Sequence, residues 1–158
     1  MKLKVMVLAA VLGLPALLLA ADAVELVKIV TSEQNGRLVD DINLPFVNDP
    51  DVIGEWYSVD FVRDIKDFVP GAKRFGGELY LGGFLFKAEG AMGVMPNAPD
   101  SAPWFKWTKG VVTHSGDRTA SRYTIKEMNG ARYMFFEWKS GDYTIKHKTP
   151  QYYVLKKK

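Results

Sequence analysis

The sequence predicts an all-β domain of roughly eight antiparallel strands, arranged as an up-and-down barrel with one short helix. The chain has a period of two: over residues 132–138, Arg132, Met134, Phe136 and Trp138 alternate with Tyr133, Phe135 and Glu137. Such β-branched and aromatic residues favour strands. Turn sequences recur at short intervals, and Asn129-Gly130 between two alternating runs is the strongest hairpin signal. A barrel is favoured over a sandwich because closure leaves no edge strand to protect.

Each expected strand is bounded by a turn or loop signal. An Asn48–Asp51 turn opens the domain, Val62–Phe68 is the helical candidate, and Met95–Pro103, with three Pro, cannot continue a central strand. The other signals are Gly82-Gly83, Glu89-Gly90, Ser115-Gly116-Asp117, Asn129-Gly130, Ser140-Gly141-Asp142 and Thr149-Pro150. The strands are expected near 54–62, 77–81, 84–88, 104–113, 119–128, 131–138, 142–147 and 151–156.

The N-terminal segment predicts export. Lys2 and Lys4 precede an apolar run over Val5–Leu19, and Ala21-Asp22-Ala23 offers the small residues of a cleavage site after Ala23. The run is shorter than the roughly 20 residues that span a bilayer, so no stable membrane span is expected after cleavage. No Cys follows it, which excludes a lipoprotein anchor. We therefore expect a signal peptide over 1–23 and a secreted or periplasmic protein.

The remaining chain divides by composition into an arm and one compact domain. Four Trp, seven Tyr and nine Phe all lie at or after Phe46. Residues 24–45 are thus expected to form a lead-in arm, with a turn at Asn35-Gly36, and residues 46–158 the barrel. A chain of 158 residues suits a single domain.

The composition excludes several kinds of site. Without Cys there is no disulfide, thiolate zinc site, iron–sulfur cluster or cysteine nucleophile. Two His, His114 and His147, cannot build a three-histidine metal site. A net charge of +3 is too small to indicate nucleic-acid binding. We expect no cofactor.

Three catalytic or metal-binding arrangements are conceivable, and each has a simpler explanation. His114 and His147 could bind a metal with Asp117 or Asp142, but exposed turn histidines are commoner. Ser115 or Ser121 could join His114 and Asp117 in a triad, yet no nucleophile-elbow pattern surrounds either Ser. Carboxylates able to form a hydrolytic pair are better explained as solvated strand residues: Glu78, Glu89, Glu127 and Glu137. The sequence therefore predicts a protein that is not an enzyme, with no metal site.

Aromatic side chains are the most informative candidates for binding. Trp104 and Trp107 follow the Pro-rich loop and are expected at the barrel rim, and Tyr143 and Tyr152 are further candidates for a lining. Glu137 lies among aromatic residues, so an inward carboxylate should be paired, with Arg122, Arg132 or a Lys.

Two functions follow from these candidates. A hollow barrel would hold a small apolar or aromatic ligand against Trp104, Trp107, Tyr143, Tyr152 and Glu137. A filled barrel would instead bind a cell-envelope glycan or a partner protein through exposed rim Trp and Tyr residues. Two or more exposed Trp would favour the second function.

Two segments resemble the signatures of lipocalins and related calycin barrels. Gly54-Glu55-Trp56-Tyr57 resembles the GxWY motif of the first strand, and Ser140-Gly141-Asp142-Tyr143 resembles the second signature, a turn between later strands. The resemblance implies structural roles for Gly54, Trp56 and Asp142, with Trp56 plugging the closed end. The third signature of that family, an Arg on the last strand that packs over the Trp, is absent, because residues 152–158 offer only Lys156–Lys158.

A second resemblance covers about residues 44–156. Leu44–Pro50, Val52–Trp56, Tyr133–Ile145 and Tyr152–Lys156 resemble an uncharacterised exported bacterial domain. That domain is also found appended to membrane metallopeptidase sensors of the beta-lactam-regulator type. The resemblance implies extracytoplasmic binding or sensing. No protease activity is implied, because the peptidase portion is not in this sequence.

Overall fold

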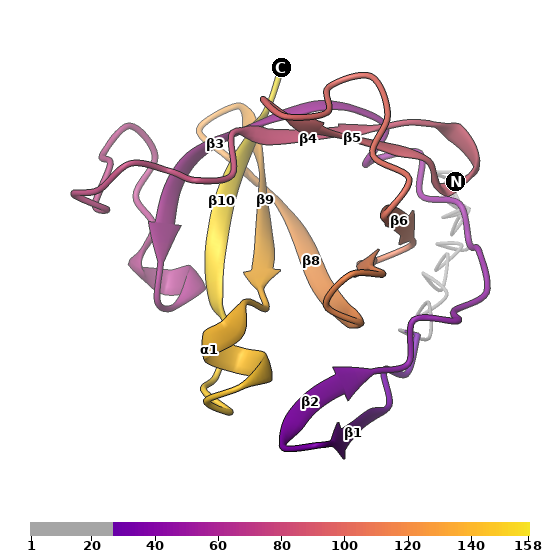
Figure 1. Cartoon of the computed structure of the whole chain (residues 1–158). Helices are drawn as coiled ribbons and strands as arrows, with labels where there is room; N and C mark the ends of the chain where they lie inside the picture. The colour runs from indigo at the N-terminus through magenta and orange to yellow at the C-terminus, as the bar shows by residue number, and fades with distance from the viewer. Residues whose placement is uncertain (1–26) are drawn as a thin grey trace, which may run out of the picture.

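A computed structural model describes residues 27–158 of the chain. The predicted signal peptide, residues 1–23, and the first residues of the arm lie outside the described residues. Eight strands form one antiparallel sheet in the order β5-β4-β3-β10-β9-β8-β7-β6, which curls into a nearly closed barrel (Figure 1). This arrangement confirms the predicted all-β, up-and-down barrel.

The barrel strands are β3 (Gly54–Val62), β4 (Gly83–Phe86), β5 (Met92–Met95), β6 (Phe105–Thr108), β7 (Val111–His114), β8 (Thr119–Met128), β9 (Ala131–Trp138) and β10 (Gln151–Lys157). Outside the barrel, β1 (Thr31–Gln34) and β2 (Arg37–Asp40) form a separate hairpin. The short helical elements are η1 (Ile65–Asp67), η2 (Ala88–Gly90) and α1 (Gly141–Thr144). Figure 1 shows α1 and the β1–β2 hairpin at one end of the barrel and the C-terminus at the other.

The barrel closes in two different ways. The first and last strands, β3 and β10, pair through backbone hydrogen bonds. Between β5 and β6 the seam is instead bridged by the Ala102 N–H, which donates to the Met92 carbonyl at 2.8 Å. The Trp107 indole N–H also reaches across, donating to the Lys87 and Ala91 carbonyls at 2.8 and 3.1 Å. Trp107 is therefore part of the wall.

Apolar side chains cover both faces of the sheet. The inner cluster fills most of the lumen and includes Trp56, Phe84, Phe86, Trp107, Tyr123, Met134, Phe136, Tyr153 and Leu155. A smaller outer cluster lies where η1 and the following loop cover β3, β10 and β9, and consists of Val62, Phe68, Tyr133, Phe135 and Val154. Along β9 the two clusters alternate residue by residue, as the period-two pattern predicts.

Two predicted strands are wrong, and three strands were missed: β5 in the barrel, and β1 and β2 in the segment predicted as an arm. Residues 77–81 are not a strand, and 142–147 contain α1. In α1 the Thr144 hydroxyl donates to the Ser140 carbonyl at 3.2 Å, and Thr144 is buried. Its β-branched side chain therefore stabilises a helical turn here and does not form part of a strand. Strand β5 lies between the predicted strands 84–88 and 104–113, where none was predicted and where the Pro-rich loop begins at Met95, and the predicted strand 104–113 is the β6–β7 hairpin. The helical candidate Val62–Phe68 contains the single 3₁₀ turn η1.

Glycine is required at two kinds of position. Asn129 and Gly130 have φ of 52° and 73°, the positive values of the predicted two-residue hairpin, and Asn35-Gly36 forms the same turn in the arm. Gly83 is required by close approach, because a Cβ there would lie 2.1 Å from the Trp56 carbonyl oxygen. Strand β4 can therefore pair closely with β3 only if position 83 is a glycine.

Candidate functional site

The strongest candidate site is a cavity of about 140 Å³ at the end of the barrel that carries α1, here called the mouth cavity. Its apolar lining consists of Phe105, Val112, Phe136 and Trp138. One wall is polar and consists of His114, Asp117, Thr119 and Ser121. Lys139, Ser140 and Gly141 form the rim. Below this cavity the lumen is filled by the inner cluster.

Strand alternation explains why these residues meet. Val112 and His114 lie on one face of β7, and they pair in register with Ser121 and Thr119 on β8. The inner face of β9 adds Phe136 and Trp138. Residues two apart on a strand share a face, so three neighbouring strands present one continuous surface to the lumen.

Aromatic packing makes the cavity lining rigid. The Phe105 ring and the His114 imidazole stack with centroids 4.4 Å apart and planes 30° apart. Trp138 packs edge-on against Tyr153, and Phe136 against Phe84, each at a centroid distance of 5.0 Å. These contacts hold flat apolar surfaces toward the opening, which suits a ring.

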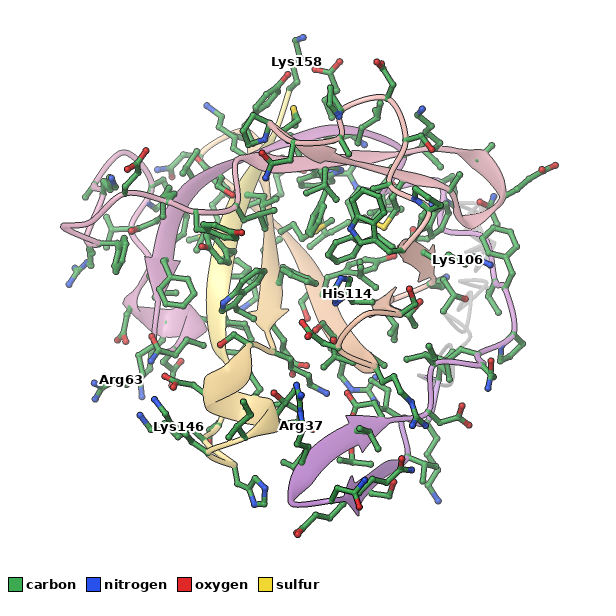
Figure 2. All side chains as sticks on the ribbon, in the orientation of Figure 1. Arg37, Arg63, Lys106, His114, Lys146 and Lys158 are labelled. Atoms are coloured by element: carbon green, nitrogen blue, oxygen red, sulfur yellow. The ribbon has the colours of Figure 1, made fainter. Side chains whose placement is uncertain are left out.

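The polar wall retains unused hydrogen-bonding capacity. The His114 Nδ1 atom accepts from the Asp117 backbone N–H at 3.2 Å and lies 3.2 Å from the Asp117 carboxylate. Figure 2 shows the His114 side chain inside the barrel, beside β8. Thr119 and Ser121 are buried residues of this wall, and their hydroxyls take part in none of the side-chain hydrogen bonds of residues 27–158. The two buried side-chain atoms without a partner in that range lie elsewhere, at Ser58 Oγ and Arg122 Nη1. A ligand hydroxyl, amine or carbonyl could hydrogen-bond with Thr119 and Ser121.

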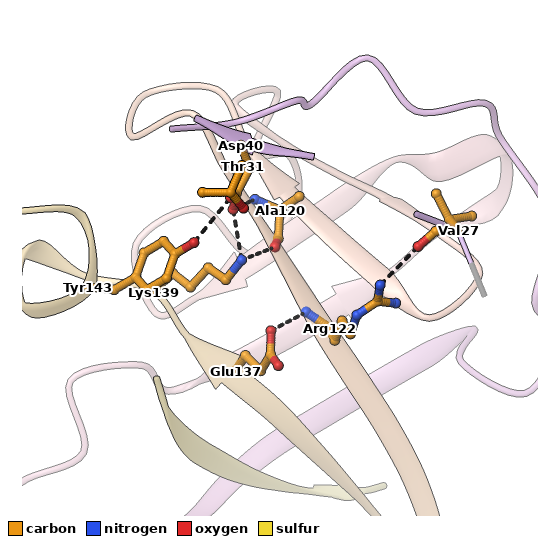
Figure 3. Close-up of polar contacts among 8 residues, drawn as sticks. All are labelled: Val27, Thr31, Asp40, Ala120, Arg122, Glu137, Lys139 and Tyr143. Carbon is orange, nitrogen blue, oxygen red and sulfur yellow. Dashed lines mark hydrogen bonds and ion pairs between the residues drawn. The ribbon is translucent and has the colours of Figure 1, made fainter. Parts of the chain in front are cut away.

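A buried ion pair anchors the arm at the rim (Figure 3). The Asp40 carboxylate accepts from Lys139 Nζ and the Ala120 N–H at 2.8 Å each. It also accepts from Thr31 Oγ1 at 2.7 Å and from the Tyr143 hydroxyl at 3.2 Å. Burial alone would raise the pKa of Asp40, but these donors outweigh it and hold the pKa below its usual value.

Two of the three N–H donors of the Lys139 ammonium are engaged within the protein. It donates to Asp40 and, at 2.7 Å, to the Ala120 carbonyl. Its Nζ atom also lies 4.7 Å from the centroid of the Tyr143 ring. The Asp40–Lys139 ion pair thus joins the β1–β2 hairpin to the end of the barrel that carries α1 and the mouth cavity (Figure 1).

None of the five residues expected to bind ligand lines the mouth cavity. Trp104 is 42% exposed on the loop before β6, and Trp107 is buried in the seam. Tyr143 holds Asp40 and lines an adjacent cavity of about 240 Å³. Tyr152 packs against the outer cluster, on the face opposite to the lumen.

Glu137 also faces outward, in line with Phe135 on β9. Its carboxylate accepts from the backbone N–H of Arg122 at 2.9 Å, whereas the Arg122 guanidinium donates to the Val27 carbonyl at 3.0 Å. Arg122 is thus a partner of Glu137 through its main chain (Figure 3).

The three residues expected to have structural roles lie at different places in the fold. Trp56 is fully buried at the base of the lumen, and its indole N–H donates to the Val52 carbonyl at 2.6 Å. Gly54 starts β3 with a φ of +116°. Asp142 lies on exposed α1, where Lys146 and Lys148 pair with it at 2.8 and 3.7 Å.

The histidines do not come together. Within residues 27–158 no group of three His, Asp or Glu side chains is placed to hold a metal ion. His147 lies instead near the Gly36 carbonyl, with its Nε2 atom 3.3 Å away. Ser121, His114 and Asp117 do share the mouth cavity, but no hydrogen bond joins Ser121 to His114 among the described contacts.

Sequence reasoning missed the residues that line the cavity. Phe136, Trp138, His114 and Ser121 were visible as alternate positions of three adjacent strands. That signal assigns them to one face of the sheet. It does not show where along the barrel the inward side chains leave a cavity.

Compared with family models, curated proteins and solved structures, the chain matches none of them. The resemblances to lipocalins and to the exported bacterial domain therefore stay predictions. Across residues 27–158 there is no helix with the length and apolar character needed to traverse a membrane.

Proposed function

We propose that this protein is an exported, non-enzymatic binding or sensing protein that holds the ring of a small apolar or aromatic molecule in the mouth cavity. One observation carries the proposal: an aromatic lining of Phe105, Phe136 and Trp138 shares the cavity with the hydroxyl residues Thr119 and Ser121. The lining supplies apolar contact and the hydroxyls supply orientation, which is the usual division of labour in a small-molecule site.

The filled lumen limits the size of the ligand. Drug-sized pockets measure about 300–1,000 Å³, whereas an apolar cavity of about 150 Å³ suffices for benzene. At about 140 Å³ the mouth cavity suits one ring. The adjacent cavity shares Trp138 and Ser140 with it, so a larger molecule could extend from one into the other across the Trp138 ring.

The test uses the full chain, expressed with its N-terminal segment and purified as the host processes it. Phenol serves as a probe, because it combines one ring with one hydroxyl. Isothermal titration calorimetry should show binding, and Ser121→Leu, which fills the cavity, should weaken the affinity at least tenfold. Thr124→Leu is the matched control, because Thr124 is exposed on the opposite face of β8.

Two results would overturn the proposal. One is no binding of phenol, indole or toluene at millimolar concentration. The other is equal loss of affinity in the Ser121 and Thr124 variants. Native mass spectrometry of exported and refolded protein adds an independent readout, since a ligand carried from the cell would be an extra mass lost on refolding.

A surface recognition module is the second candidate, and the exposed indole of Trp104 favours it. A cell-envelope glycan or a partner protein could stack on this ring. Trp56 and Trp107 are buried and Trp138 is partly buried, so among the described residues Trp104, at 42% exposure, is the one exposed Trp where this function expects two or more. Trp104→Ala should leave phenol binding unchanged if the mouth cavity is the site.

A further inference from the structure

The outer face of the sheet carries a second cleft, remote from the mouth cavity. Its volume is about 260 Å³, and it lies between the loop that follows η1 and strands β3, β10 and β9. Phe68 and Tyr133 pack together with ring centroids 5.0 Å apart, and Val59 completes an apolar floor. Gly71, Ala72 and Lys73 form the opposing wall.

A tight turn holds that wall in place. The Ala72 N–H donates to the Val69 carbonyl at 3.1 Å, and Val69 and Ala72 form an isolated bridge. The Lys73 ammonium donates to the Gly77 carbonyl at 2.9 Å, which orients its side chain along the loop. The cleft is therefore built by local contacts and does not depend on the arm.

Two lysines, Lys73 and Lys156, line the cleft, and a third, Lys126, lies beside its floor. Tyr133 is flanked in register by Lys126 on β8 and by Lys156 on β10. Direct cross-strand neighbours have Cβ atoms about 4.5–5.5 Å apart, so both stems lie beside the Tyr133 ring. Lys126 Nζ also lies 5.7 Å from the centroid of the Phe135 ring on the same face. Lys73 approaches from the loop.

These three cations have no counter-ion. All three side chains are exposed, and none forms an ion pair within residues 27–158. By contrast, Lys66, Lys139, Lys146, Lys148 and Lys158 each have a carboxylate partner. Uncompensated like charges around a concave apolar surface produce a positive potential there, which favours an anion.

We propose that this outer cleft binds an amphiphilic carboxylate, a short alkyl or aryl acid. Its apolar part packs against Phe68 and Tyr133, and its carboxylate lies among Lys73, Lys126 and Lys156. The apolar floor accounts for affinity by burial, and the lysines select the charge. This site is independent of the mouth cavity, because Tyr133 and Phe136 lie on opposite faces of β9.

Octanoate is the probe, titrated into the full processed protein by calorimetry. Octanoate should bind, and the affinity should fall at least tenfold in the triple variant Lys73→Gln/Lys126→Gln/Lys156→Gln. The matched control Lys66→Gln/Lys106→Gln/Lys146→Gln removes the same charge elsewhere and should stay within twofold of the native protein. Binding should weaken as salt is raised, and Ser121→Leu should leave it unchanged.

Any of four calorimetric results would overturn the proposal. They are no binding of octanoate, equally tight binding of octan-1-ol, equal loss of affinity in both triple variants, and loss of octanoate binding in Ser121→Leu. Binding to vesicles of anionic phospholipid without binding of monomeric octanoate would also contradict it, and would indicate a membrane surface. The substituted lysines are exposed, so both triple variants should fold, which circular dichroism checks.

Discussion

The Nζ atom of Lys157, on the last strand, lies 5.3 Å from the centroid of the Trp56 ring on the first strand of the barrel. The two residues pair in register between β10 and β3, and Lys157 Nζ also donates to the Asp51 carbonyl at 2.7 Å. Burial, with help from nearby Arg132, lowers the pKa of Lys157. Lys157 is therefore the cation that covers the Trp56 ring at the base of the barrel.

The first prediction concerns this contact. Lys157→Met should lower the free energy of unfolding by about 1 kcal/mol, because a partly desolvated cation over a Trp face contributes roughly that much. Lys157→Arg should retain most of this stabilisation, because it keeps a cation over the Trp56 ring. Urea unfolding at pH 7 measures both. Lys156→Met is the control, since the Lys156 side chain is exposed, and an equal loss there would contradict a specific role for the Trp56 contact.

Local sequence patterns predicted β3, β8 and β9 at their observed bounds. Their period-two alternation and the Asn129-Gly130 turn act over neighbouring residues, so they can be read without the fold. Strand β5 was missed because Gly93 and the following Pro96 disfavour strands. Its Gly93 is needed for a non-local reason, since a Cβ there would lie 2.1 Å from the Pro99 carbonyl oxygen.

Helix α1 was not predicted, because its residues favour a strand locally while a distant contact holds them in a helical turn. Tyr143, Thr144 and Ile145 favour strands, but Tyr143 bonds Asp40, which is 103 residues away in the sequence. The spacing of Asp142 and Lys146, which pair as i and i+4, was the one local sign of a helix.

The candidate site was harder to predict than the fold. The sequence shows which residues share the inner face, such as His114 and Ser121. The cavity exists because Trp56, Phe84 and Met134 fill the lumen only up to a certain depth. That depth depends on how side chains from distant strands pack, and no spacing in the sequence encodes it.

A second prediction concerns the ion pair that anchors the arm. Asp40→Ala should cost about 3 kcal/mol, because it leaves the Lys139 ammonium buried beside a single carbonyl. The double variant Asp40→Ala/Lys139→Met should cost less than the sum of the single variants. A double-mutant cycle in urea measures the coupling, and hydrogen exchange should show lower protection in the β1–β2 hairpin. Additive costs with unchanged exchange would contradict the anchoring role.

A third prediction concerns acid. The pKa of Asp40 is lower in the folded protein than in the unfolded chain, so the folded state binds this proton less readily. The contribution of Asp40 to the stability of the folded protein is therefore present above the usual carboxyl pKa of about 4. It is lost as the pH falls through the pKa that Asp40 has in the folded protein. The stability gap between the native protein and Asp40→Asn should narrow from pH 6 to pH 3. Thermal unfolding measures it, and a gap that widens toward low pH would refute the assignment.

The last prediction concerns alkali and Tyr123, whose hydroxyl donates to the Asp49 carboxylate at 2.9 Å. Burial, and then the negative charge of Asp49, raises the pKa of Tyr123 well above its usual value near 10. Above about pH 10 the unfolded chain releases this proton while the folded protein keeps it, so stability falls as the pH rises.

Tyr123→Phe should cost about 1–2 kcal/mol at pH 7, because it leaves the Asp49 carboxylate without this donor. The variant should also lose less stability than the native protein between pH 9 and pH 11. Urea unfolding across that range measures both slopes, and Tyr57 and Tyr152, whose pKa values are also raised, are present in both proteins. Parallel slopes would mean that Tyr123 ionises equally in the folded and unfolded states, contrary to its burial against Asp49.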